Sequence, residues 1–280
     1  IYCRPDQAKD LFLEVMRLHA RYYDLFGIKE YYMHLSLPDM DNLEKYVDRP
    51  EQWRKAVEII QAAMQESGLP YEEVPGEAAF YGPKVDFQIK NALGNEFTIS
   101  TNQLDFFAAE RFNLSYQGED GQRHPVYVIH RAPLGSHERF TAFLLEHYKG
   151  IFPLWLAPEQ LRIITVAEDD ALKAYAQKVY NFLFSANVPT ATGGLRIHLD
   201  KSNETLNKKV RMAQQAAIPY IIVIGNREVE NNTLSIRLRN NRSITLPVDV
   251  FLQRLHAEIS QRADWSRQEE VSITKQKAVD

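Results

Sequence analysis

The pattern of apolar and polar positions divides the chain into regions of different periodicity. Near the start, apolar residues recur every three or four positions in residues 6–27 and again in 50–67, which is the spacing of amphipathic helices. A glycine ends each segment, Gly27 for the first and Gly68 just after the second, as is common at helix ends. The polar, irregular stretch between them, residues 35–51, predicts a surface connection.

After the second helix the period changes to two, the alternation of strands. Residues 84–90 (KVDFQIK) and 95–101 (NEFTIST) flank the turn NALG and predict two antiparallel strands of one sheet. A further strand is expected over 124–132, and residues 136–150 then predict a helix with Ser136 as its cap. Sheet strands followed by a helix indicate an α+β domain built on an antiparallel sheet.

Residues 153–160 contain two prolines and no clean period, which predicts a linker to a second domain. Beyond it strands and helices alternate. Extended segments are expected at 161–167, 188–192, 197–200, 220–225, 233–239 and 243–246, and helices at 169–186, 203–217 and 247–261. This order predicts a three-layer α/β domain over 161–262, after a first domain of residues 1–152 and before a polar, mobile tail, 263–280.

Composition and charge add limits to this picture. The chain has 280 residues and no apolar run near the roughly 18 residues that a membrane span needs. Its one cysteine, Cys3, cannot form an internal disulfide, which indicates a reducing cytoplasm. Residues 1–160 hold 16 Lys and Arg against 24 Asp and Glu, whereas 161–262 hold 14 against 9. Either the second domain binds a polyanion or the charges cluster by chance.

The segment VIHRAPLGSHERF, residues 128–140, concentrates charge at the end of a strand. Arg139 lies in the first turn of the predicted helix, where its five donors suit triphosphate oxygens, and Gly135 lets a ligand approach the backbone. The alternative for Arg139 is an ordinary surface residue. His130 shares a strand face with Val128, so it is either a core histidine or a ligand residue. No second His or Cys stands nearby at metal spacing, so the chain holds no complete zinc site.

Two further stretches present polar groups to one side. Tyr81 and Lys84 flank a Gly-Pro turn that would aim a phenol and an ammonium into one pocket. Thr101, Gln103 and Asp105 alternate along a strand and would suit the amino and hydroxyl groups of a small ligand. The alternative is a turn and a half-buried strand without such a role.

In combination, AFYGPK, STNQLDF and HRAPLGSHERF resemble the second half of the threonyl-tRNA synthetases, from about residue 4 to 260. The third stretch, within residues 130–140, is similar to motif 3 of the class II synthetases in that family's version. The resemblance implies that residues 1–152 are the end of a class II catalytic domain, incomplete at its N-terminus. It also implies that 161–262 form an anticodon-binding domain.

The resemblance also implies residue roles. Arg139 matches the motif 3 arginine that binds ATP, which is used with Mg²⁺, and Lys84 matches a lysine facing the reaction centre. His130 matches one of three ligands of a Zn²⁺ that grips threonine. Substrate-binding positions are Tyr81, Thr101, Gln103, Ala132 and Ser136. Positions that would contact anticodon bases are Asn203, Arg211, Glu228 and Arg237, with Lys208 and Arg239 as further donors; the alternative there is a solvated basic surface.

The same resemblance places the family's motifs 1 and 2, and the other zinc ligands, upstream of Ile1. Two functions therefore stay open. In the first, the chain is part of a cytoplasmic, homodimeric enzyme that attaches L-threonine to tRNA(Thr) through threonyl adenylate, and the chain by itself is inactive. The alternative is a non-catalytic paralog or fragment that binds tRNA without activating an amino acid.

Overall fold

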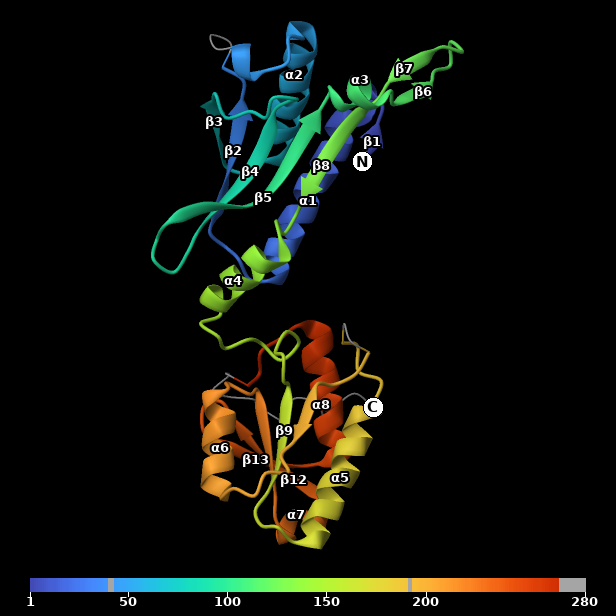
Figure 1. The fold of residues 1–280 in the computed structure, drawn as a ribbon. Coiled ribbons are helices and arrows are strands. Elements are labelled where there is room, and N and C mark those ends of the chain that lie inside the picture. Colours follow the sequence, from blue (N-terminus) through green and yellow to red (C-terminus); the bar gives the residue numbers. More distant parts are fainter. Residues whose placement is uncertain (40–42, 191–192, 267–280) are drawn as a thin grey trace, which may run out of the picture. The chain divides into compact units, whose positions relative to one another are not determined.

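The chain folds into two compact units, Ile1–His147 and a second unit that begins at Tyr148 (Figure 1). The computed structural model describes residues 1–39, 43–190 and 193–266. Within these parts, no helix combines the length and the apolarity needed to cross a membrane.

The first unit is built on a six-stranded sheet with the order β1-β8-β5-β4-β2-β3. Its strands are β1 (Tyr2–Cys3), β2 (Tyr31–Leu37), β3 (Tyr71–Pro75), β4 (Lys84–Lys90), β5 (Glu96–Asp105) and β8 (Tyr127–Ala132). Every neighbouring pair is antiparallel except β2 with β3. The predicted α+β class with an antiparallel sheet is therefore confirmed.

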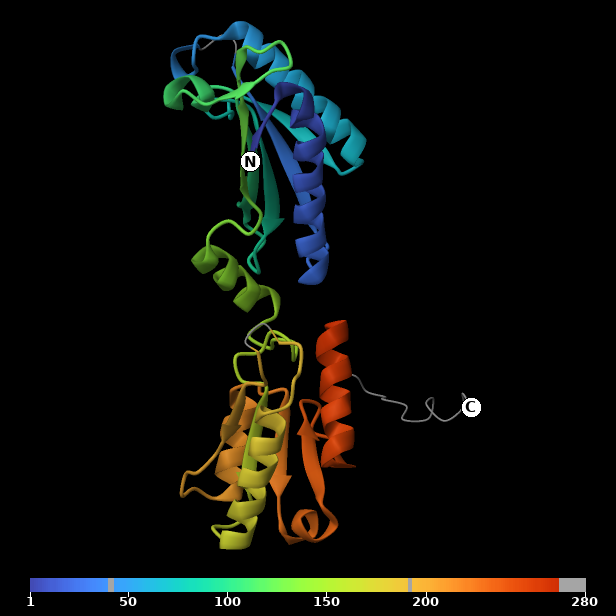
Figure 2. The ribbon, with the colours of Figure 1, turned by 90° about the vertical axis from the view of Figure 1, so that its right-hand side faces the viewer.

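Two long helices, α1 (Ala8–Leu25) and α2 (Pro50–Ser67), pack against each other and cover one face of this sheet (Figure 2). The bounds of α2 are those predicted, and Gly68 takes the left-handed conformation at its C-cap. The remaining elements are the 3₁₀ turns η1 (Pro5–Gln7) and η2 (Leu43–Lys45), the helices α3 (Ala108–Phe112) and α4 (His137–His147), and a hairpin of β6 (Ser115–Gln117) and β7 (Arg123–Pro125).

Two sequence predictions in this unit are wrong in part. The surface connection expected from residue 35 overlaps β2, whose Leu35 is 0% exposed and pairs with Val85 of β4. The strand expected over 124–132 is broken, because β7 ends at Pro125 and β8 begins two residues later. Proline lacks the N–H that a continuous ladder requires, which accounts for the break.

The second unit contains a five-stranded sheet with the order β10-β9-β11-β12-β13. Its strands are β9 (Leu161–Thr165), β10 (Ile197–Leu199), β11 (Tyr220–Ile224), β12 (Thr233–Leu238) and β13 (Ser243–Pro247). The first three strands in the order are parallel to one another, and β12 and β13 pair antiparallel.

Helices lie on both faces of this sheet (Figure 1). The faces are covered by α5 (Asp170–Phe184) with α8 (Val248–Gln261) on one side and α6 (Leu206–Gln215) on the other. Ile163 of β9 belongs to the α5 and α8 core, whereas its neighbour Ile164 packs with Ala213 of α6. The three-layer α/β prediction is confirmed, while the short polar helix α7 (Asn226–Asn231) was not predicted.

The ends of the predicted second domain are packed rather than free. Residues 153–160 have no helix or strand, as expected, but Leu154 is 0% exposed in the α5 and α8 core, so the segment is part of this unit. Within the expected tail, the Trp265 N–H donates to the buried Glu258 of α8. Residues 188–190 form no strand, and 191–192 and 267–280 lie outside the described residues.

Candidate functional site

Three predicted site residues form a row across the sheet of the first unit. Lys84 of β4 pairs with Gln103 of β5, and Gln103 pairs with His130 of β8. Residues directly opposite on neighbouring strands have Cβ atoms about 5 Å apart and point to the same face. The structure therefore brings an ammonium, an amide and an imidazole together on one face.

Tyr81, which precedes β4, closes over this row. Its hydroxyl donates a hydrogen bond to Oε1 of Gln103, and its ring meets the His130 ring edge to face with centroids 5.6 Å apart. Burial, with smaller contributions from the negative charges of Asp105 and Asp86, raises the pKa of the Tyr81 hydroxyl. Gln103 in turn donates through Nε2 to Oγ1 of Thr101 at 3.2 Å. This chain of hydrogen bonds orients the Gln103 amide.

Two carboxylates balance the cations of the site. Asp105 was expected on one face with Thr101 and Gln103, whereas Asp86 was missed by the sequence analysis. Lys84 forms an ion pair with Asp86, two positions along the same strand. His130 Nε2 lies 2.9 Å from Oδ2 of Asp105, whose side chain is 7% exposed. The same signal was available for Asp86, because residues two apart on a strand share a face and Asp86 lies two positions after Lys84. The core-histidine interpretation is wrong, since the His130 side chain is 47% exposed.

These residues do not by themselves form a zinc site. Among the described residues no group of three His, Cys, Asp or Glu side chains is placed to hold a metal ion. Structural and catalytic zinc sites need three or four such ligands. His130 supplies one imidazole, already paired with Asp105, so these parts of the chain do not fit the implied metal on their own.

Arg139 lies in the first turn of α4, at some distance along β5 from the row. Its Nη1 donates to the carbonyl of Thr98 at 3.3 Å, and its N–H donates to Oγ of Ser136 at 3.2 Å, which confirms Ser136 as the helix cap. Ala132, at the end of β8, pairs with Thr101. Within the described parts of the chain, no hydrogen bond or ion pair joins Arg139 to the row.

The predicted role of Gly135 needs correction. Its φ is +60°, and a Cβ at this position would lie 2.3 Å from the carbonyl oxygen of Ile99. The glycine is therefore required by the close approach of the chain's own strand β5, rather than by a ligand.

In the second unit the predicted base-contacting residues lie in two groups. Arg237 of β12 pairs with Ile221 near the amino end of β11, and both face α6, on whose exposed surface Arg211 lies. Asn203 and Glu228 instead follow the carboxyl ends of β10 and β11. Glu228 Oε2 accepts the N–H of Gly225 at 2.9 Å, so part of this carboxylate is used to begin α7.

The two additional donors differ in their surroundings. Arg239 lies beyond the end of β12, and its guanidinium donates to the backbone carbonyls of Ala217 and Phe152, the latter at 2.7 Å. Because these bonds tie the unit together, the prediction of Arg239 as a base donor is wrong. Lys208 is exposed and pairs with Glu204 at 2.7 Å.

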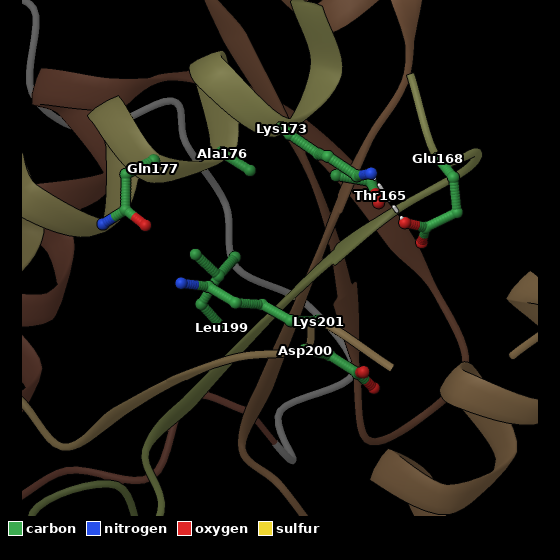
Figure 3. A pocket seen from close by; sticks show the side chains of 8 residues that line it. All are labelled: Thr165, Glu168, Lys173, Ala176, Gln177, Leu199, Asp200 and Lys201. Atoms are coloured by element: carbon green, nitrogen blue, oxygen red, sulfur yellow. Dashed lines mark ion pairs between the residues drawn. The ribbon is translucent and has the colours of Figure 1, made fainter. Parts of the chain in front are cut away.

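A polar cavity of about 370 Å³ opens at the carboxyl ends of β9 and β10 (Figure 3). Its lining residues are Thr165, Glu168, Lys173, Ala176, Gln177, Leu199, Asp200 and Lys201. Glu168 pairs with Lys173 at 2.9 Å and with Lys209, which is 2% exposed, at 3.3 Å. Ligands of open α/β sheets commonly bind at this edge. Sequence reasoning missed the cavity because its walls come from three separate segments.

Two family models match the two units. The tRNA synthetase class II core domain (G, H, P, S and T) matches residues 1–148, and the anticodon binding domain matches residues 160–262.

Individual relatives agree with these matches. Proteins named threonine–tRNA ligase from Halalkalibacterium halodurans and Listeria welshimeri are both 45% identical to this chain, over 92% and 93% of it and 39% and 40% of their own lengths. The chain thus spans about two fifths of these relatives. Among solved structures, the RNA binding domain of a threonyl-tRNA synthetase from Cryptosporidium parvum superposes with a TM-score of 0.81 at 29% identity, covering 94% of this chain and 62% of that one. A putative threonyl-tRNA synthetase from Aeropyrum pernix gives 0.70 at 27% identity, covering 93% and 62%.

Proposed function

We propose that this chain, which belongs to the class II tRNA synthetase core family, is part of an enzyme that attaches threonine to its tRNA through threonyl adenylate. The observation that carries the proposal is the row of Lys84, Gln103 and His130, closed by Tyr81, on one face of the antiparallel sheet. The shared name of the curated relatives supports threonine as the amino acid.

In this proposal the amino acid binds at the row. The Gln103 amide, held by Tyr81 and Thr101, offers neutral hydrogen-bonding groups in a set orientation. Asp86 and Asp105 provide negative charge beside it for the ammonium of an amino acid. No step is assigned to a zinc ion, because the described residues hold only His130 of the implied ligands.

The triphosphate binds at the other end of the site. Class II synthetases use ATP with Mg²⁺, and Arg139 is the arginine that the first helical turn of α4 presents beside β5. A guanidinium is always charged and can bind two phosphate oxygens at once. Ala132 and Ser136 form the wall between the two ends. Residues 1–152 thus act in adenylate formation.

Residues 161–262 bind the anticodon in this proposal. Arg211 is exposed on α6, and Arg237 lies on the face of β12 that is turned toward α6, so both offer donors to splayed bases of a single-stranded loop. Asn203 and Glu228 would contact a base at the other edge of the same unit. This division separates the chemistry of the first unit from RNA recognition by the second.

A threonine-dependent pyrophosphate exchange assay on the whole natural protein tests the proposal. We expect Arg139→Ala to abolish exchange, Arg237→Ala to leave exchange intact and weaken tRNA charging, and the exposed control Arg123→Ala to change neither. Exchange supported equally by serine, or equal loss of exchange in the Arg139 and Arg237 variants, would refute the proposed roles. Binding of tRNA without any exchange would favour the non-catalytic alternative.

A further inference from the structure

A cavity of about 490 Å³ lies in the second unit between the end of α6 and the turn that joins β12 to β13. Its lining residues are Ile151, Gln214, Ala217, Ile218, Ile221, Arg237, Leu238, Arg239 and Asn241. Its apolar lining includes the buried Ile218 and Ile221, and Gln214, Arg237, Arg239 and Asn241 supply polar side chains. Pockets for small organic ligands have this volume and this distribution of polarity.

Three of the polar side chains form one hydrogen-bonded group. Oδ1 of Asn241 accepts from Nε2 of Gln214 at 2.6 Å and from Nη2 of Arg237 at 3.3 Å. A guanidinium can only donate, so Arg237 requires the oxygen of Asn241 to face it. Gln214 must then donate to the same oxygen. This leaves the Gln214 oxygen as an acceptor and the Asn241 amide nitrogen as a donor toward the cavity.

The group is held in place by its backbone. Asn241 has a φ of +66°, a left-handed conformation that Asn tolerates better than most residues. Arg239 also lines the cavity, and its guanidinium is fixed by donating to the carbonyls of Ala217 and Phe152. Nε of Arg237 is buried and has no hydrogen-bond partner among the described residues, so the guanidinium is only partly satisfied within the protein.

We propose that Gln214 and Asn241 are specificity-determining residues that, together with Arg237, hold one keto base of an RNA loop in this cavity. The inference rests on the proposed function of the second unit as an RNA-binding domain. Single-stranded RNA is recognised by splaying out bases, stacking them and reading their Watson–Crick edges. Ile218 and Ile221 supply the contact surface for the ring.

The preference for a keto base follows from the count of hydrogen-bonding groups. Arg237 and the Asn241 amide provide donors, and the Gln214 oxygen provides one acceptor. Guanine and uracil combine carbonyl acceptors with a ring N–H donor on this edge and match that set. Adenine and cytosine carry an amino group where guanine and uracil carry a carbonyl, which would place donors against donors.

Binding of tRNA(Thr) transcripts to the 280-residue chain tests this inference, with each anticodon base replaced in turn. The variants are Gln214→Ala and Asn241→Gly, since glycine accepts the left-handed conformation. Gln215→Ala and Asn232→Gly are matched controls: Gln215 is the exposed neighbour on α6, and Asn232 has a φ of +51° outside the cavity.

For the wild-type chain we expect one keto-to-amino replacement to weaken binding by about tenfold, the effect of roughly one lost base contact. The Gln214 and Asn241 variants should bind the unchanged transcript about tenfold more weakly and no longer distinguish the two bases, whereas the controls behave as wild type. Discrimination that persists in both variants would overturn this inference and leave the proposed function standing. A wild-type chain that binds every transcript alike would overturn both.

Discussion

The buried histidine of α1 predicts that the first unit loses stability in mild acid. His19 is 0% exposed, stacks on Phe87 with ring centroids 4.4 Å apart, and hydrogen-bonds through Nδ1 to Oγ of Ser100 at 3.1 Å. Its Nε2 has no partner among the described residues. Burial, and to a smaller extent the positive charge of Arg131, lowers the pKa of His19 from 6.5 to about 3.

The sign follows from proton linkage. The unfolded chain takes up a proton on this histidine near pH 6.5, whereas the folded chain stays neutral there until about pH 3. The stabilisation is therefore complete above pH 6.5 and is lost as the pH falls toward 3. At about 1.4 kcal/mol per pKa unit, the free energy of unfolding should fall by about 3 kcal/mol between pH 7 and pH 4 from His19 alone.

Urea unfolding at several pH values measures this loss. Replacing Trp155 and Trp265 by Phe leaves Trp53 as the one tryptophan, which then reports on the first unit. In that background, His19→Gln keeps a polar side chain and removes the titration. The difference in unfolding free energy between the two proteins should shrink by about 3 kcal/mol from pH 7 to pH 4. A difference that is independent of pH would refute the assignment of His19 as a buried neutral group.

Three further predictions concern strain and buried charge. Gly135→Ala should destabilise the first unit by at least about 1 kcal/mol more than Gly94→Ala, because both have positive φ but only Gly135 faces a backbone atom; equal urea midpoints would contradict this. Burial raises the pKa of Glu258 to about 7, so its stabilisation is present below pH 4.5 and lost as the pH rises through 7. Between pH 4.5 and pH 8 the free energy of unfolding of the Glu258→Gln variant should therefore rise by up to about 3 kcal/mol relative to that of the wild type. Unfolding free energies that change with pH in parallel in the two proteins would refute this. Glu168→Gln should lower the free energy of unfolding of the second unit by about 1–3 kcal/mol, because buried Lys209 loses its ion pair. An unchanged melting temperature would exclude a stabilising role for this ion pair.

The helices were predictable where several local signals agreed. In α2 the apolar period, a proline at the first position and the left-handed Gly68 all specify the same bounds. In β2 the local signals do not agree on a strand, because Met33, Leu35 and Ser36 are all buried and apolar and polar residues do not alternate simply. The polar α7 has no apolar period to detect. Tertiary packing determines β2, whereas α7 is bounded by local caps, Glu228 at its start and the left-handed Asn232 at its end, which an apolar period does not reveal.

The types of residue in the site could be predicted from the sequence, but their pairing could not. Which residue of β5 lies opposite each residue of β4 depends on a register shift between Phe87 and Gln88 of β4. Ile99 is the extra residue of β5 at this shift. Continuing the register of the NALG turn without this shift would pair Lys84 with Asn102. A shift of one residue turns every side chain to the opposite face, so Gln103 would then leave the row.

The same irregularity connects the two ends of the proposed site. Thr98 adjoins the register shift and Ile99 is its extra residue. The Thr98 carbonyl accepts a hydrogen bond from the guanidinium of Arg139, and the Ile99 carbonyl lies close against the backbone of Gly135. Bulges bend a strand and are frequent next to active sites. This one bulge determines both the face of the sheet on which Gln103 lies and the position of the start of α4. A change that removes the bulge would therefore displace the amino-acid end and the triphosphate end of the proposed site together. Deleting Ile99 should therefore abolish threonine-dependent pyrophosphate exchange by the whole natural protein even if the sheet still forms.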